Sequence, residues 1–272
     1  MTVHLFMHTL RHRRLAILWF CAGLFLWNIL VMAVWPAYRD LGMQNVLEGM
    51  PDGVRAALLG DAFDHPEVER NSFYTFIVSE LTAWLPFVLA YFGVSVGGGV
   101  VARAYGRRTI DLMLAHPITR ERFLLTRFAA VILGAVIIVA GSLVGMLIGV
   151  SVWAGNTLVS ATDIVLVHVQ LLLFGLAVAA LSLCLAAWLL EPGRTYGVSA
   201  LIMVVMYTLT LVAQFVEPLQ WMGYASLFRY WQPLEQFTTG NFSWAYSLVL
   251  TGSSVVGLAL AVVVFRRRDI VT

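Results

Sequence analysis

The stretch LAILWFCAGLFLWNILVMAVW, residues 15–35, decides what kind of protein this chain forms. It carries no charged side chain and is as long as a membrane-spanning helix, which needs about 20 predominantly apolar residues. Over the whole chain, 60% of the residues are apolar and 12% are charged, and the mean hydropathy is +0.85. A soluble domain carries about 25% charged residues. The composition therefore indicates a protein whose solvent is largely lipid.

Five further runs have the length and composition of a membrane span. With the first run, the spans are expected at about residues 15–35, 74–101, 124–150, 161–190, 196–216 and 244–265. Pro86 predicts a kink in the second span, because proline cannot donate the helical hydrogen bond. The residues EPGR at 191–194 predict a tight turn between the fourth and fifth spans. The sequence therefore predicts an all-α membrane protein with six transmembrane helices in one domain, residues 1–272.

The placement of arginine predicts how these spans are oriented. Six spans put both termini on one side of the membrane, and thirteen of the seventeen arginines fall on that side. Cytoplasmic loops carry an excess of cations, so both termini are expected to be cytoplasmic. The chain contains no lysine, and a phosphate-binding loop of an ATPase requires one. The chain itself is therefore not expected to be a P-loop ATPase, and its net charge of +2 argues against a nucleic-acid binder.

Two segments have an amphipathic pattern but are not expected to span. Val3, Phe6, Met7 and Leu10 follow the i, i+3, i+4, i+7 spacing of one helix face, with polar residues on the other face. This pattern predicts an N-terminal interfacial helix that lies on the inner leaflet. Residues 43–58 form a second apolar stripe. Ordinary anchoring to the membrane surface explains both stripes.

The segment GRRTIDLMLAHPITR, residues 106–120, lies between the second and third spans on the arginine-rich side. The expected apolar face of this short helix consists of Ile110, Met113 and Leu114, and its polar residues are Arg107, Arg108 and Asp111. Thr119 is expected to cap the third span, with Glu121 in its first turn. A helix at this place is what a transmembrane protein would need to receive mechanical force from a soluble motor protein. An arginine-rich loop that happens to be helical is the alternative.

Three motifs of this sequence resemble those of the ABC-2 type permeases, the membrane-spanning subunits of bacterial ABC exporters. The stretch RTIDLMLAHPITR, residues 108–120, resembles the coupling-helix signature of that family. The ending FRRRDI at 265–270 and the segment SLFRYWQP at 226–233, before the last span, are similar to two further family features. One departure is that Ala104, Tyr105 and Gly106 stand where the family usually carries a glutamate, and Arg108 replaces a glycine.

The resemblance implies a subunit of the bacterial cytoplasmic membrane that pairs with a second permease copy or a related permease. Two P-loop ATPase subunits would dock beneath the pair, and ATP and Mg²⁺ would bind to those partners. The coupling helix would sit in a cleft of the ATPase and transmit its motion to the spans. The residues that match this helix are Arg107, Arg108, Thr109, Ile110, Asp111, Met113, Leu114, His116, Pro117 and Arg120.

Other candidate sites in the sequence are weaker. Glu80, in the second span, and Tyr207 and Gln214, in the fifth, are candidates for a polar substrate path. A carboxylate at the membrane interface explains Glu80 equally well, and ordinary contacts between neighbouring helices explain the other two. Glycines recur at i, i+4 spacing in the second and third spans, which predicts close packing within one subunit or between two subunits. They are Gly93, Gly97, Gly141, Gly145 and Gly149.

The cargo cannot be specified beyond a class. Few polar residues line the expected spans, which favours a hydrophobic or amphiphilic substrate. No metal site is expected, because His116 and His168 fall on different sides of the membrane. The alternative functions are a self-sufficient secondary transporter, which would place ionisable residues in mid-membrane, or a membrane enzyme.

Overall fold

The computed structural model describes residues 2–40, 49, 51, 54, 72–102, 119–154 and 159–267. All regular elements in these ranges are helical. The α-helices are α1 (Thr2–Asp40), α5 (Ser72–Phe76), α6 (Leu85–Phe92), α9 (Arg120–Gly149), α10 (Ala161–Leu189), α11 (Pro192–Phe215), α12 (Pro233–Thr239) and α13 (Trp244–Arg267). The π-helical segments are η2 (Ile77–Thr82), η3 (Gly93–Gly97) and η4 (Val150–Ala154), and the 3₁₀ segments are η5 (Glu217–Ala225) and η6 (Leu227–Tyr230).

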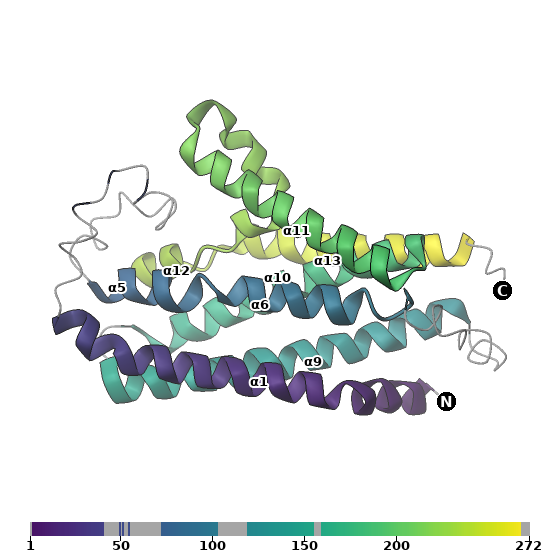
Figure 1. Cartoon of the computed structure of the whole chain (residues 1–272), viewed down its shortest axis with the longest axis horizontal. Coiled ribbons are helices and arrows are strands. Elements are labelled where there is room, and N and C mark those ends of the chain that lie inside the picture. The colour runs from purple at the N-terminus through teal and green to yellow at the C-terminus, as the bar shows by residue number, and fades with distance from the viewer. Residues whose placement is uncertain are drawn as a thin grey trace.

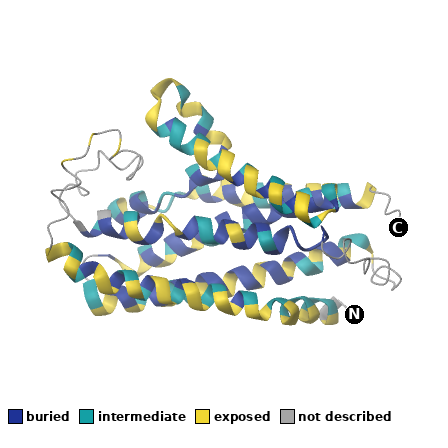
Figure 2. Cartoon of the chain, in the orientation of Figure 1, coloured by how far each residue is buried: buried dark blue, intermediate teal, exposed yellow. Residues whose placement is uncertain are grey.

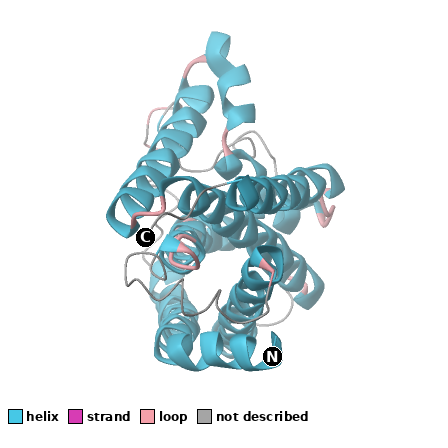
Figure 3. Ribbon diagram, turned by 90° about the vertical axis from the view of Figure 1, so that its right-hand side faces the viewer, coloured by secondary structure: helices cyan, strands magenta, loops and turns pink. Residues whose placement is uncertain are grey.

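Six helices in the described ranges are long and apolar enough to cross a membrane, which confirms the expected number. They cover His4–Asp40, Ile77–Gly97, Arg120–Ala154, Ala161–Leu189, Pro192–Phe215 and Trp244–Arg267. The helices run alternately up and down a long bundle, and both ends of the chain lie at one end of it (Figure 1). Figure 3 looks along the bundle from that end. Nine of the eleven described arginines belong to this end, which we call the arginine-rich end.

The N-terminal residues do not form the separate helix that their amphipathic stripe suggested. They are the first turns of α1, which continues into the first span without a break. At 1.5 Å per residue a helix of 39 residues is about 58 Å long, almost twice the thickness of the bilayer core. Periodicity alone cannot reveal such continuity, because the helical pattern of the stripe and that of the span share one period.

The second span changes its helical form twice. It runs from η2 through α6 to η3, and the N–H of Ala83 bonds to the carbonyl of Val78 in the five-residue spacing of a π turn. Pro86 follows near the start of α6, and it has no N–H to bond to the carbonyl of Thr82. The break therefore lies where the sequence predicted a kink.

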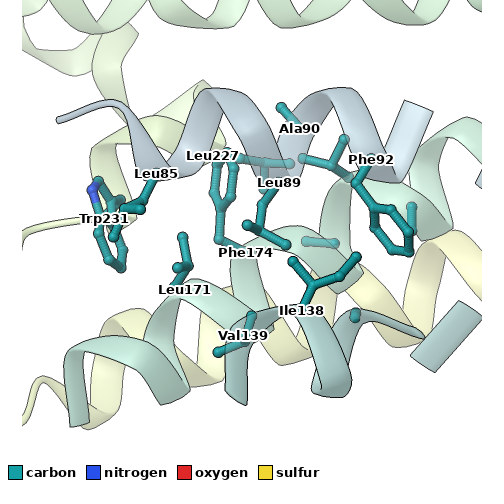
Figure 4. Packing of buried hydrophobic residues seen from close by; sticks show 14 of the residues in the cluster. Leu85, Leu89, Ala90, Phe92, Ile138, Val139, Leu171, Phe174, Leu227 and Trp231 are labelled. Carbon is teal, nitrogen blue, oxygen red and sulfur yellow. The ribbon is translucent and has the colours of Figure 1, made fainter. Parts of the chain in front are cut away.

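Helix α10 forms the centre of the bundle: the second, third, fifth and last spans pack against it, and α1 packs against α9. Figure 2 shows buried residues gathered where helices face one another, with exposed residues on the outward faces of α1 and α11. In Figure 4, side chains of α6, α9 and α10 meet in the core, among them Leu89, Ile138 and Phe174. Helix α11 contributes much less: 17% of its most apolar window is buried, against 61% for α10. It leans away from the bundle, with η5 at its far end (Figure 1).

The small residues of the third span pack within the subunit. A Cβ atom placed on Gly145 would lie 2.5 Å from the carbonyl oxygen of Phe25, and one on Gly149 would lie 2.8 Å from the side chain of Met32. One on Gly141 would meet the sulfur of Cys21. These contacts let α9 and α1 approach closely. Gly93 and Gly97 play the same part between the second span and α10.

Candidate functional site

The segment that resembles a coupling helix follows Ala102 in the chain and ends at Arg120, the first residue of α9, at the arginine-rich end. Its residues from Arg107 to Pro117 lie outside the described residues. The structure does describe the two flanks of the segment, residues 98–102 and 119–127. We call these two flanks the junction.

The returning flank is a capped helix N-terminus. The hydroxyl oxygen of Thr119 accepts a hydrogen bond from the backbone N–H of Arg122 at 3.3 Å, and Thr119 itself has extended backbone angles. Glu121 lies in the first turn, where the positive end of the helix dipole stabilises its negative charge. The predicted cap at Thr119 is therefore confirmed. Arg120 is the first residue of α9 and its side chain is half-buried.

Arg127 ties the two flanks to each other. Its Nη1 donates a hydrogen bond of 2.6 Å to the carbonyl oxygen of Val100, and its guanidinium lies 4.6 Å from the centre of the Phe123 ring. Val100 lies three residues beyond Gly97, where the apolar helix of the second span ends. A charged donor satisfies that carbonyl and binds the end of the second span to the start of α9. A hydrogen bond to a charged group contributes about 1.5–3 kcal/mol.

A third helix and a fourth meet the junction at Gly99. A Cβ atom placed on Gly99 would lie 2.8 Å from Nη2 of Arg13 and 2.8 Å from the hydroxyl oxygen of Tyr196. Arg13 belongs to α1 and Tyr196 to α11, so three spans converge on a residue that has no side chain. The Arg13 guanidinium is also near enough to Arg127 for their charges to interact.

The last span is joined to the junction by one ion pair and one ring contact. Nε of Arg266 lies 2.9 Å from a carboxylate oxygen of Glu121, and the two side chains are 64% and 41% exposed. Exposed ion pairs contribute about 0–1 kcal/mol. Phe123 and Phe265 are both 1% exposed and stack with their ring centres 6.4 Å apart. The buried rings therefore hold α13 against α9, and the ion pair is a second, weaker contact between the same two helices.

The three candidates for a substrate path lie on two elements. Glu80 is exposed on η2, and its charge acts on Tyr38, two residues before the end of α1. This position near the end of the bundle opposite the junction favours a carboxylate at the membrane interface. Tyr207 of α11 packs edge-on against Phe87 and Phe228, at 4.8 and 5.5 Å between ring centres. Gln214 is half-buried further along α11. A path through these residues stays a prediction.

A polar cluster inside the membrane was not expected from the sequence. Asn28 of α1, Ser142 of α9 and His168 of α10 are each at most 1% exposed. Nδ2 of Asn28 donates to Oγ of Ser142 at 3.1 Å, and Oγ of Ser142 lies 3.1 Å from Nε2 of His168. In the sequence, the only sign of this cluster is that each of three apolar runs contains one of these polar residues. The sequence alone does not show that the three side chains are in contact.

The partners of His168 define the direction of its hydrogen bonds. Its Nδ1 lies 2.8 Å from the carbonyl oxygen of Ile164. A carbonyl only accepts, so Nδ1 carries the hydrogen and Nε2 of the neutral ring accepts from the hydroxyl of Ser142. Both ring nitrogens are therefore occupied, and the cluster joins α1, α9 and α10 in a medium that supplies no water to polar groups.

The segment SLFRYWQP, residues 226–233, is largely buried against the end of the bundle opposite the junction. Oγ of Ser226 accepts a hydrogen bond from the N–H of Phe228 and so starts η6. Nε2 of Gln170, which is buried in α10, donates to the carbonyl oxygen of Tyr230 at 2.9 Å. These bonds fasten the connection before α13 to the central helix.

One short motif of the second span has the spacing of a catalytic serine. Residues 93–97, GVSVG, fit the pattern G-x-S-x-G of a nucleophile elbow, which requires a sharp turn from a strand into a helix. Here the motif is the π-helical η3, and its two glycines pack against α10. The motif therefore serves helix packing.

The described residues also contain no group of three or more histidine, cysteine or carboxylate side chains that could hold a metal ion.

A family described as "Protein of unknown function (DUF2705)" matches residues 57–271, which is most of the chain and includes the junction and five of the six spans. A comparison with curated proteins gives no match.

Proposed function

The chain belongs to the DUF2705 family, and we propose that it is the permease subunit of an ATP-binding cassette exporter. It would lie in the bacterial cytoplasmic membrane with both termini in the cytoplasm and pair with a second permease copy or a related permease. A separate P-loop ATPase would bind ATP and Mg²⁺. The cargo would be hydrophobic or amphiphilic, in keeping with the apolar spans.

The junction is the observation that carries this proposal. The segment that resembles a coupling helix has its two flanks joined to each other, because Arg127 of the returning flank binds Val100 of the other flank. A loop that only connects two spans has no need for its two ends to be joined. A segment that receives force from a partner needs its two ends to be joined. Otherwise the flanks would bend and the force would not reach the spans.

The contacts of the junction indicate which helices such a force would move. The second span and α9 would move together through Arg127. Helix α1 would follow α9, because the two helices pack closely at Gly145. Helix α13 would follow through Phe265 and Arg266. ATP binding on the partner would then bias a two-state arrangement of the whole bundle.

Exchange of Arg127 for methionine should separate ATP hydrolysis from transport. Arg127→Met keeps the apolar stem and removes the donor to Val100, so the ATPase should still bind and hydrolyse ATP. Cargo transported per ATP should fall about tenfold or more, since a bond of this kind contributes about 1.5–3 kcal/mol. Reconstituted complexes, assayed for both rates, provide the measurement. Arg122→Met, at an exposed side chain of the same helix, is the control, and equal coupling in both variants would refute the role of Arg127.

The function itself is tested with the partner. We expect a P-loop ATPase encoded beside this gene to co-purify with the chain, and the purified complex to hydrolyse ATP in response to hydrophobic or amphiphilic compounds. The purified chain alone should hydrolyse none, because no lysine is present to form a phosphate-binding loop. Hydrolysis by the isolated chain, or cargo transport by the isolated chain in an ion gradient, would overturn the proposal.

A secondary transporter is the second candidate, and His168 is the residue that favours it. Ionisable residues inside a membrane often serve ion coupling. His168, however, is 1% exposed and has a partner at each ring nitrogen, which favours a clamp between helices. If the isolated chain took up a substrate driven by a proton gradient, and the His168→Gln variant did not, the protein would be a secondary transporter.

A further inference from the structure

A groove runs along the outer surface of the bundle between α1 and α6. Its volume is about 450 Å³, and its walls are apolar and rich in tryptophan: Trp19, Trp27, Trp84, Leu85 and Val88. The three indoles stay open to the surroundings, with exposed fractions of 77%, 39% and 55%. The groove is thus a feature of the face that two spanning helices present to the membrane.

A glycine forms the floor of the groove. Trp19, Gly23 and Trp27 follow one another at i, i+4, i+8 on one face of α1, and Gly23 also lines the groove. Glycine in a helix costs about 1 kcal/mol relative to alanine. At Gly145 that cost is offset by close packing against α1, but no described protein atom lies within 4 Å of a Cβ atom placed on Gly23. Gly23 therefore keeps a slot open between two indoles.

The length of the groove limits what can fill it. From Trp19 to Trp27 the slot extends about 12 Å along α1, at 1.5 Å per residue. A helix of a partner subunit would run along the whole bilayer core of about 30 Å. A slot of 12 Å with apolar walls instead suits a flexible hydrocarbon chain.

The guanidinium of Arg13 lies between α1 and the second span, on the arginine-rich side of the groove. Arg13 precedes Trp19 by six residues, about 9 Å along α1, and its guanidinium reaches Gly99 at the end of the second span. Exposed Arg11 and Arg14 flank it. The distance from Arg13 to Trp27 is thus about 21 Å, which equals one leaflet including its headgroups, about 20–22 Å. Charge and length together fit one lipid, with its phosphate beside the arginines.

We propose that the groove between α1 and α6 binds an acyl chain of an anionic phospholipid, with the headgroup phosphate at Arg13. The slot at Gly23 receives the chain, and Trp19, Trp27 and Trp84 enclose it. Anionic lipids are attracted to clusters of arginine at the membrane surface. The site belongs to this chain alone and does not depend on the proposed ATPase partner.

Photocrosslinking tests this site. The purified chain is placed in phosphatidylcholine nanodiscs that contain a small fraction of phosphatidylglycerol with a diazirine on its acyl chain, and labelled residues are identified by mass spectrometry. We expect α1 and α6 residues of the groove to be labelled several-fold more than the exposed Leu248 and Val255 of α13. Unlabelled phosphatidylglycerol should compete, and added phosphatidylcholine should not.

Variants test the slot itself. Gly23→Phe fills it and Trp19→Ala removes a highly exposed wall, so each should reduce labelling of the groove several-fold. Gly252→Phe is the matched control, because Gly252 of α13 also has no described atom within 4 Å of its Cβ position. Equal labelling of all outward faces or equal competition by phosphatidylcholine would overturn the proposal.

Discussion

Leu114→Asp is expected to abolish co-purification of the ATPase subunit and transport, while the permease still inserts into the membrane. Leu114, with Met113 and Ile110, would form the apolar face that enters the cleft of the ATPase, and an aspartate there would bury an unpaired charge. Interface energy is concentrated in a few desolvated residues. The expected loss is about 2–4 kcal/mol, or roughly 30- to 1,000-fold in affinity. Met113→Asp should act in the same way.

The measurement is the amount of ATPase retained by the purified permease, together with ATP-dependent transport in proteoliposomes. Arg107→Ala is the control, because a charge at the rim of an interface affects association rate and salt dependence more than affinity. Insertion is verified by the yield of the permease in washed membranes. If the aspartate variants retain the ATPase and transport at full level, residues 106–120 are only a connecting loop and the proposed mechanism fails.

Gly145→Leu is expected to prevent the accumulation of folded protein. A Cβ atom at this position would already lie 2.5 Å from the backbone oxygen of Phe25, and a backbone atom cannot move aside as the end of a side chain can. Helices α1 and α9 would have to separate, which would also strain the hydrogen bond between Asn28 and Ser142. Overpacking commonly costs about 1–3 kcal/mol, and the loss of this cluster adds to it.

Size-exclusion chromatography and thermal unfolding in detergent measure this effect. Gly252→Leu is the control, since Gly252 has open space at its Cβ position, and it should behave like the unmodified protein. A folded Gly145→Leu variant with unchanged thermal stability would show that α1 and α9 do not pack as the structure places them.

Features that depend on a short stretch of chain were determined by the sequence alone. The six spans follow from runs of apolar residues, which confine such segments to lipid wherever they pack. The cap at Thr119 follows from a hydroxyl placed before a helix. The turn between α10 and α11 follows from Pro192, which can begin a helix but cannot continue one.

Features that depend on which helices are neighbours were decided only by the tertiary structure. A soluble helix reveals its inward face by its apolar stripe, but a spanning helix is apolar on every face, because lipid and protein interior are equally apolar. Gly23 and Gly145 are therefore alike in the sequence, although Gly145 touches the backbone of α1 and Gly23 faces an open groove. For the same reason the meeting of Asn28, Ser142 and His168, and the tie between Arg127 and Val100, became visible only when the helices were placed side by side.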